Sequence, residues 1–325
     1  MPDQVISLNV FQAFYKTSLG IKLDQHPSYK LHLMKVKFFS NYTDPASLLK
    51  RFKANYRLED NVMQITAAED YNYAVVFNST ADKIKKEAKV ITIIQEPTWS
   101  DAFGIDAHFL QHSDILITHD PALLAWRTNI KLGGHLIVAP SLLFYNDKID
   151  KAFFAESHKV PKKKKLSIIM SSLRLLPGNY TKRLTLLKTI LASDLEIDIF
   201  GGGLQTHDCR YKGELEYKHQ GLLPYEYSIA IENCNEYNYV TEKFMDCTLC
   251  ATIPIYNGAP NIKEIYDADY IRYIDLDSNT IIDDIRKIIA QPAPLNNTNA
   301  EIYFTRYNLY AILKDIIMEY ENHLI

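Results

Sequence analysis

The chain has 325 residues, of which 47% are hydrophobic and 23% charged, the composition of an ordinary soluble globular protein. Its length exceeds what one hydrophobic core usually supports, so two domains are expected. The formal net charge of −3 excludes a general nucleic-acid-binding protein, whose surface would have to be basic.

The sequence shows no signal for export or for membrane insertion. Residues 1–20 lack a basic stretch followed by a long apolar core, and no window has the apolar length of a membrane helix. We therefore predict a protein without a transmembrane segment, either cytoplasmic or peripheral to a membrane. The four cysteines are too few for a disulfide scaffold. Cys247 and Cys250 have no second pair at zinc spacing and are interpreted as small core residues.

Apolar runs separated by helix-like segments make up the first half of the chain. The runs cover residues 31–39, 71–77, 89–95, 114–119 and 135–140. One helix-like segment opens with Asp44 and Pro45, residue types that favour the cap and the first turn of a helix. Continuous apolar strands that alternate with helices predict a parallel sheet covered on both faces.

The alternation stops at a polar and basic interval, residues 146–165, and then starts again. The basic run Lys162–Lys165 is interpreted as the solvated end of a linker. The later predicted strands cover residues 166–172, 195–203, 227–231, 252–256 and 270–276, with helices at 180–192 and from 240 onward. Residues 299–324 have aromatic residues at helical spacing and predict one long amphipathic helix. The fold class is therefore α/β, with domains at 1–150 and 151–325.

Two charged clusters interrupt the apolar pattern of residues 227–258: Glu232-Asn233 and Thr241-Glu242-Lys243. The first follows a strand, and the second falls in the first turn of a predicted helix. Free N–H groups and the helix dipole favour an anion there, and Lys243 adds a full positive charge. A diphosphate fits this site, with Glu242 accepting hydrogen bonds from ribose or sugar hydroxyls. The alternative is that Thr241 and Glu242 only cap the helix.

The same stretch resembles the hallmark of the α1,3-fucosyltransferases, a strand ending in Glu-Asn followed by Tyr-Val-Thr-Glu-Lys and a later Pro-x-x-x-Gly. Residues 239–243 carry the Tyr-Val-Thr-Glu-Lys motif intact. Cys234 stands where the family usually has serine, and Cys250-Ala251 replaces a glycine-bearing pair. The resemblance extends more weakly over residues 164–280, and only in outline over the N-terminal half.

The resemblance implies an inverting glycosyltransferase of GT-B fold, with two Rossmann-like domains facing across a cleft. Residues 1–150 would receive the acceptor glycan, and residues 151–325, with the C-terminal helix, would bind GDP-fucose. It also implies that no metal or other cofactor is essential. The Asp-x-Asp strings at 267–269 and 275–277 flank a strand and are interpreted as turn and cap residues. The implied donor-binding residues are Arg183, Gly201, Glu232, Asn233, Tyr239, Thr241, Glu242 and Lys243.

Without a metal, basic side chains must neutralise the charge that develops on the leaving diphosphate. The family places a basic residue at the start of the helix after strand 166–172, which matches Arg183, with Arg174 in reserve. The alternative is a solvent-exposed helix arginine. Gly201, in the glycine-rich end of a strand, is expected either to form a wall of the donor site or to serve as a plain turn.

An inverting transfer also needs a base for the acceptor hydroxyl. Glu96 directly follows an apolar strand, at the position where the family carries its proposed base, and Trp99 is a candidate for stacking on an acceptor sugar. The alternatives are a solvated loop glutamate and a packing tryptophan. His119 and His135, both at strand ends, are minor candidates.

These residues predict transfer of L-fucose from GDP-fucose to an acceptor glycan, with an α1,3 linkage to a GlcNAc- or glucose-type residue. The lack of an anchor is more similar to bacterial or viral members of the family. The expected partners are the nucleotide sugar and the acceptor glycan, with no nucleic acid. Two alternatives stay open: a GT-B transferase with another nucleotide-sugar donor, and a non-catalytic glycan-binding module.

Overall fold

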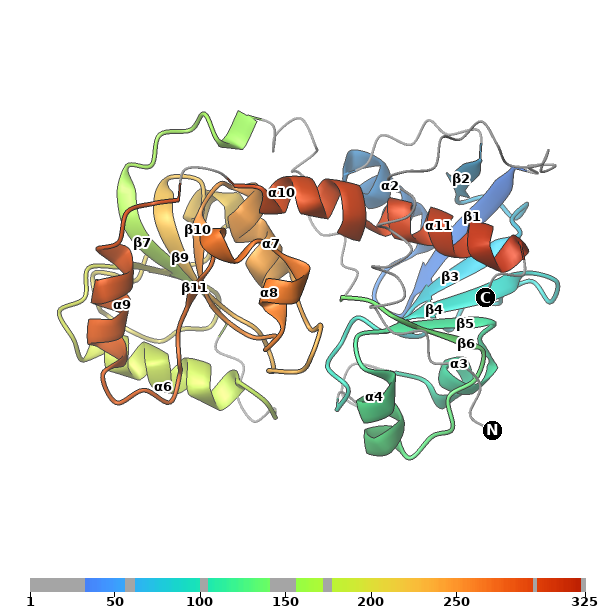
Figure 1. The fold of residues 1–325 in the computed structure, drawn as a ribbon, viewed down its shortest axis with the longest axis horizontal. Coiled ribbons are helices and arrows are strands. Elements are labelled where there is room, and N and C mark those ends of the chain that lie inside the picture. The colour runs from blue at the N-terminus through green and yellow to red at the C-terminus, as the bar shows by residue number, and fades with distance from the viewer. Residues whose placement is uncertain are drawn as a thin grey trace. The chain divides into compact units, whose positions relative to one another are not determined.

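The computed structural model describes residues 33–55, 62–99, 105–140, 156–171, 177–294 and 297–322. The chain forms two compact units, each built around a parallel sheet with helices packed on it (Figure 1). The first unit comprises Met1–Lys148 together with Asn308–Ile325, and the second comprises Ile149–Tyr307. The expected α/β class is therefore confirmed.

The first unit contains a six-stranded sheet in the order β2-β1-β3-β4-β5-β6, with every pair parallel. Its strands are β1 (Met34–Ser40), β2 (Met63–Thr66), β3 (Tyr73–Phe77), β4 (Lys89–Ile93), β5 (Ile115–Thr118) and β6 (His135–Val138). Within the described residues its helices are α2 (Pro45–Asn55), α3 (Ala107–His112), α4 (Pro121–Thr128) and α11 (Leu309–Glu321). The side chain of Asp44 accepts hydrogen bonds from the Ala46 and Ser47 amides, as its predicted capping role requires.

The C-terminal helix α11 packs on the first unit, whereas the sequence-based division placed it with the second. Tyr310 donates a 3.3 Å hydrogen bond to the Met63 carbonyl, and the hydroxyl of Tyr73 bonds Glu321. The helix is also shorter than predicted. Residues 299–307 form α10 (Asn299–Ile302) and a π-helical turn (Tyr303–Tyr307), and Asn308 then caps α11. Helical periodicity reveals an apolar face but does not say which sheet will cover it.

The second unit contains a five-stranded sheet in the order β11-β10-β9-β7-β8, again with every pair parallel. The strands are β7 (Lys164–Ile169), β8 (Asp198–Phe200), β9 (Tyr225–Ile231), β10 (Ile253–Asn257) and β11 (Arg272–Tyr273). The larger helices are α6 (Tyr180–Leu191), α7 (Glu242–Leu249) and α9 (Ile281–Ile289), with the short α8 (Ile262–Ile265). The sequence order along both sheets reverses once, so each has a topological switch point.

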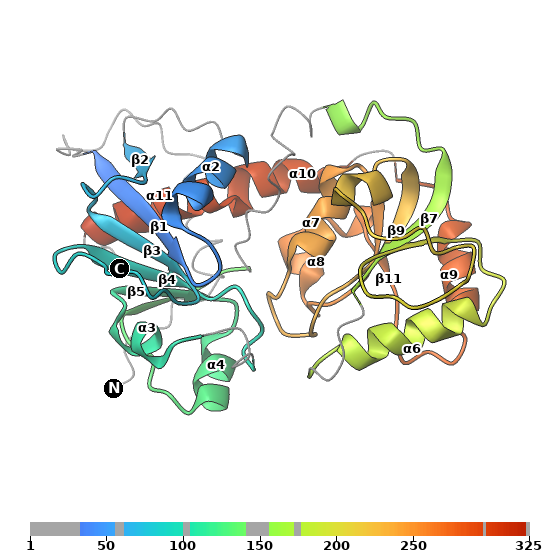
Figure 2. The same ribbon diagram turned by 180° about the vertical axis from the view of Figure 1, so that it is seen from behind.

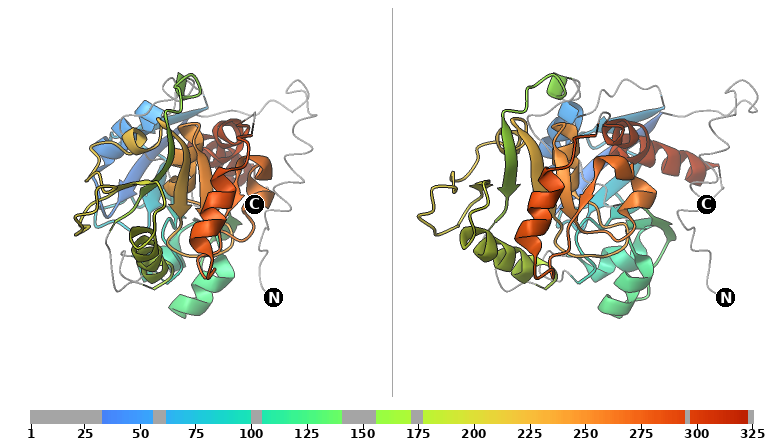
Figure 3. Two further views of the ribbon diagram at one scale, coloured as in Figure 1. Left: turned by 90° about the vertical axis from the view of Figure 1, so that its left-hand side faces the viewer. Right: turned by 60° about the vertical axis from the view of Figure 1, so that its left-hand side comes forward.

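The two faces of the second sheet are covered by different helices (Figure 2 and Figure 3). On one face, Tyr227, Ile229 and Ile231 of β9 pack in one cluster with apolar side chains of α6 and α9. On the other face, Ala230 packs in a second cluster with α7 and α8. This alternation along β9 is the two-residue period of a strand buried on both sides.

The basic run at the start of β7 is not solvated along its whole length, as the predicted linker end would be. Lys162 is half-buried, and its ammonium group donates to the Leu223 and Cys250 carbonyls at 2.8 and 2.7 Å. Burial lowers the pKa of Lys162 to about 8. The basic run is therefore solvated only after its first residue. Cys247 and Cys250 are buried thiols, as interpreted from the sequence. Among the described residues, no helix combines the length and the apolar character that crossing a membrane requires.

Candidate functional site

A cavity of about 380 Å³ lies at the carboxyl ends of β7, β8 and β9 in the second unit. The strand order reverses between β7 and β9, and in open parallel sheets ligands bind at such a switch point. The predicted residues that line the cavity are Arg183, Gly201, Asn233, Glu242 and Lys243. They come from four different segments, so the parallel topology is what brings them together.

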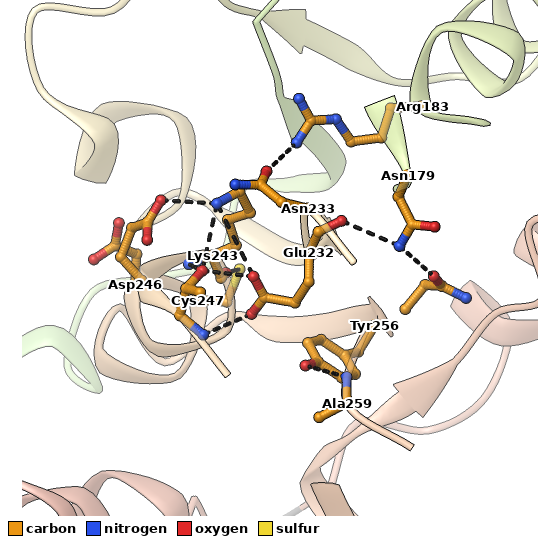
Figure 4. A network of polar contacts seen from close by, with 12 residues as sticks. Asn179, Arg183, Glu232, Asn233, Lys243, Asp246, Cys247, Tyr256 and Ala259 are labelled. Atoms are coloured by element: carbon orange, nitrogen blue, oxygen red, sulfur yellow. Dashed lines mark hydrogen bonds and ion pairs between the residues drawn. The ribbon is translucent and has the colours of Figure 1, made fainter. Parts of the chain in front are cut away.

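Arg183 belongs to the first turn of α6 and is only 6% exposed. Its Nη1 donates a 2.9 Å hydrogen bond to Asn233 Oδ1 (Figure 4), and its guanidinium lies 4.5 Å from the centre of the Tyr180 ring. Its buried Nε has no hydrogen-bond partner among the described residues. The alternative of a solvent-exposed helix arginine is therefore wrong. The reserve candidate Arg174 lies outside the described residues.

Asn179 links the start of α6 to the end of β9, a contact that the sequence analysis did not predict. Its side-chain amide donates to the Glu232 carbonyl at 3.2 Å and to Asn235 Oδ1 at 2.6 Å, and its backbone N–H donates to the Asn233 carbonyl (Figure 4). These bonds set the distance between Arg183 and the strand-end loop. A lone asparagine before a helix gives no sequence signal for this role.

Glu232 is fully buried and does not line the cavity. Its carboxylate accepts two hydrogen bonds from Thr241, one from the backbone N–H at 2.8 Å and one from the hydroxyl at 2.5 Å. Thr241 is in turn the N-cap of α7, and its hydroxyl oxygen accepts a bond from the Lys243 amide. Glu232 and Thr241 therefore position the start of α7, which matches the capping alternative for Thr241.

Glu242 and Lys243 occupy the first turn of α7 and form an ion pair, with Lys243 Nζ 3.0 Å from Glu242 Oε1. The same ammonium lies 4.0 Å from Glu232 Oε2. Lys243 thus faces the carboxyl groups of both residues. The helix N-terminus, the ammonium and a carboxylate together can bind a diphosphate and an adjacent hydroxyl.

The cavity also contains charged residues that the sequence motif did not indicate, Lys218 and Asp246. Lys218 precedes β9 on the short helix η3 (Lys218–Gly221), and Asp246 lies one turn after Glu242 on α7. Their ion pair measures 3.0 Å. The four-residue spacing of Glu242 and Asp246 was the available signal, because such residues share one helix face.

The acidic side chains of this cluster have different environments. Burial raises the pKa of Glu232 to about 7, against the opposing charge of Lys243. Burial also raises the pKa of Asp246. Burial acts in the same direction on Glu242, but Lys243 and Lys218 outweigh it and hold its pKa well below the usual range. Glu242 therefore stays ionised across neutral pH.

Two other residues predicted to bind the donor, Gly201 and Tyr239, have structural roles in the backbone and in packing. Gly201 follows β8 with a φ of +138°, and a Cβ atom there would lie 1.6 Å from the Met170 carbonyl oxygen. Its backbone forms part of the cavity wall. Tyr239 is 1% exposed and does not line the cavity.

The predicted acceptor-side residues lie in the first unit, after β4. Glu96 and Trp99 are both half-buried, in a loop of which residues up to 99 are described. The backbone N–H of the neighbouring Gln95 donates to Asn78 Oδ1 at 2.9 Å. His119 follows the carboxyl end of β5 and is buried, but His135 begins β6. His135 therefore lies at the opposite edge of this parallel sheet, so the two histidines do not face the same cleft.

The Asp-x-Asp strings have local hydrogen-bonding roles. Asp267 accepts from the Asp269 amide and caps a short helix, and Asp275 accepts from the Asp277 amide in a turn. Within the described part of the chain, no group of three or more His, Cys, Asp and Glu side chains is arranged to hold a metal ion. The interpretation of both strings as turn and cap residues is confirmed.

Residues 160–308 match the family model for the C-terminal domain of glycosyltransferase family 10 (fucosyltransferase). This segment is therefore similar to the C-terminal domain of the glycosyltransferase family 10 proteins. The match contains the whole cavity described above and ends where the second unit ends. The family resemblance of the Tyr-Val-Thr-Glu-Lys segment is thereby confirmed.

Similar proteins agree with the family match. A fucosyltransferase-like protein of Arabidopsis thaliana is 32% identical over 120 residues, 36% of this chain and 22% of the relative. The alpha-(1,3)-fucosyltransferase FucT of Helicobacter pylori is 28% identical over 122 residues, 33% of this chain and 24% of the relative. The match thus spans less than a quarter of either relative.

A solved structure extends the likeness to the whole fold. The crystal structure of an alpha1,3-fucosyltransferase superimposes with a TM-score of 0.50 at 16% identity, over 87% of this chain and 82% of the other. The expected GT-B fold class is thereby confirmed.

We predict that Gly201→Ala destabilises the second unit by more than about 1 kcal/mol, since its backbone conformation disfavours any Cβ atom. Gly202→Ala is the matched control, because its Cβ would meet only the flexible end of Glu214, at 3.2 Å. Urea unfolding of the two variants measures the difference. Equal stability of both would contradict the backbone explanation.

The raised pKa of Glu232 predicts that the stability of the folded chain depends on pH. Its pKa is raised from 4.5 to about 7 in the folded state, so its contribution is fully present below pH 4.5 and is lost as the pH rises through 7. The variant Glu232→Gln lacks the titrating carboxyl group and therefore this contribution to stability. We expect the free energy of unfolding of the wild type, relative to the variant, to fall by about 1–3 kcal/mol between pH 4.5 and 8. A constant difference across that range would refute the assignment.

Proposed function

We propose that the chain transfers L-fucose from GDP-fucose to a hydroxyl of an acceptor glycan, with inversion at the anomeric carbon. The observation that carries this proposal is the cavity at the switch point, where Arg183 and the Glu242–Lys243 pair of a helix N-terminus surround one volume. The family 10 match of the same residues supports the donor class. Residues 151–307 bind the donor, and residues 1–148 receive the acceptor.

The charges of the cavity suit departure of a nucleoside diphosphate. Negative charge develops on the diphosphate as the bond to C1 of fucose breaks. Lys243 and the free N–H groups of α7 stabilise it from one element, and Arg183 stabilises it from another. Arg183 is suited to this task because Asn233 holds its fork in place and the side chain is already desolvated. With these groups, transfer needs no metal ion.

Glu96 acts as the base in this proposal. It removes the proton from the acceptor hydroxyl, whose oxygen attacks C1 from the face opposite the diphosphate. Glu96 is half-buried and directly follows an apolar strand. Trp99, beside it in sequence, stacks on the acceptor sugar. The acceptor is a GlcNAc- or glucose-type residue, joined through an α1,3 linkage.

The donor class is tested by thermal-shift titration of the purified chain with GDP, GDP-fucose, UDP and CMP in the presence of EDTA. A ligand that binds only the folded state raises the melting temperature once its concentration exceeds the dissociation constant. Shifts with GDP and GDP-fucose alone support the proposal. A shift with UDP or CMP alone points to another donor, and no shift with any nucleotide points to a non-catalytic glycan-binding module.

Lys243→Ala should weaken GDP binding by about ten- to a hundredfold, because a hydrogen bond to a charged group contributes about 1.5–3 kcal/mol. It also leaves Glu242 without its closest cation. Lys243→Arg is the control that keeps the charge. Isothermal titration with GDP measures both variants. Unchanged GDP affinity in Lys243→Ala would remove Lys243 from the donor site.

Glu96→Gln should lower kcat by about a hundredfold or more, the contribution of a general base, and leave the dissociation constant for GDP unchanged. The substitution keeps the shape of the side chain and removes only its basicity. Initial rates of fucosyl transfer, together with GDP titration, measure the two effects. Wild-type turnover in this variant would exclude Glu96 as the base.

A further inference from the structure

Lys218 lies in the donor cavity, although it is outside the motif that identifies the site. It comes from η3, on the connection between β8 and β9, whereas Lys243 comes from α7. About a third of its side chain is exposed, so a ligand in the cavity can reach it. The cavity therefore combines two ammonium groups that are far apart in sequence.

The ammonium groups of Lys218 and Lys243 both lie close to one carboxylate oxygen. Oε1 of Glu242 lies 3.0 Å from Lys243 Nζ and 3.6 Å from Lys218 Nζ. Two cations on the same oxygen are near neighbours in space. A nucleoside diphosphate has two adjacent phosphate groups, so each ammonium can bind oxygens of one or of both.

Asp246 holds the ammonium of Lys218 in position. The Asp246 side chain is 6% exposed and forms a 3.0 Å ion pair with Lys218 Nζ. Removing the cation from so buried a carboxylate is costly, so Lys218 stays beside Asp246 when a ligand enters. An ammonium group has three N–H donors and can bind a phosphate oxygen while it keeps this partner.

We propose that Lys218 binds the diphosphate of the donor together with Lys243, and that Asp246 is the positioning residue of Lys218. This inference rests on the proposed function and deepens it by adding a second ammonium to the donor site. Lys218 lies farther from Glu242 than from Asp246, so the contact to Glu242 is the one exchanged for phosphate.

A double variant separates phosphate binding from simple neutralisation of Asp246. Lys218→Met alone strands a buried carboxylate and can unfold the chain. Lys218→Met combined with Asp246→Asn removes both charges and leaves the net charge of the cavity unchanged. We expect this double variant to bind GDP about ten- to a hundredfold more weakly than the wild type. Guanosine, which lacks phosphate, should bind both proteins with affinities within about twofold.

Isothermal titration of the wild type, the double variant and Lys218→Arg with GDP and with guanosine decides between the outcomes. Retention of most of the GDP affinity in Lys218→Arg supports a charge-based contact. Wild-type GDP affinity in the double variant overturns the inference, because Lys218 would then serve only to neutralise Asp246. Equal losses for GDP and guanosine also overturn it. A wild type that binds no GDP contradicts the proposed function itself, and the inference with it.

Discussion

The donor cavity depends on one buried interaction, the acceptance of two Thr241 hydrogen bonds by the carboxylate of Glu232. This contact joins the end of β9 to the first turn of α7 and so determines where Glu242 and Lys243 point. Gly258 makes the arrangement sterically feasible, because a Cβ there would lie 2.4 Å from Glu232 Cγ. The glycine after β10 in the family motif thus has a packing reason. A buried carboxylate is costly unless it is hydrogen-bonded, and Thr241 supplies both bonds.

Around this contact, the cavity holds nearly balanced charges in a desolvated environment. Three acidic side chains, those of Glu214, Glu242 and Asp246, line it together with the basic side chains of Arg183, Lys218 and Lys243. Buried ions of this kind contribute little to stability, because desolvation offsets their attraction. Their value is preorganisation, since charged groups held in place need not reorient when an anionic ligand enters.

Both units follow one topological rule with different chemistry. Each sheet reverses its strand order once, and in each the side chains after the strands gather at the carboxyl edge. In the second unit that edge carries Asn233, which holds Arg183, and the charged cavity. In the first it carries Asn78, Gln95 and Glu96, and the left-handed backbone of Asn78, with φ 61°, lets its side chain hold the Gln95 amide. The parallel fold supplies the position, and the loops supply the chemistry.

The sequence by itself determined the α/β class, most strands and helices, and the charged residues of the motif, because apolar periodicity and cap residues are local signals. It did not reveal β2, a short edge strand, or the break at Asn308 before α11. Only the tertiary structure showed that α11 packs on the first sheet, that Glu232 lies behind the cavity wall, and that Lys218 and Asp246 belong to the site. Such facts depend on contacts between segments far apart in the chain, and no local pattern of residues encodes them.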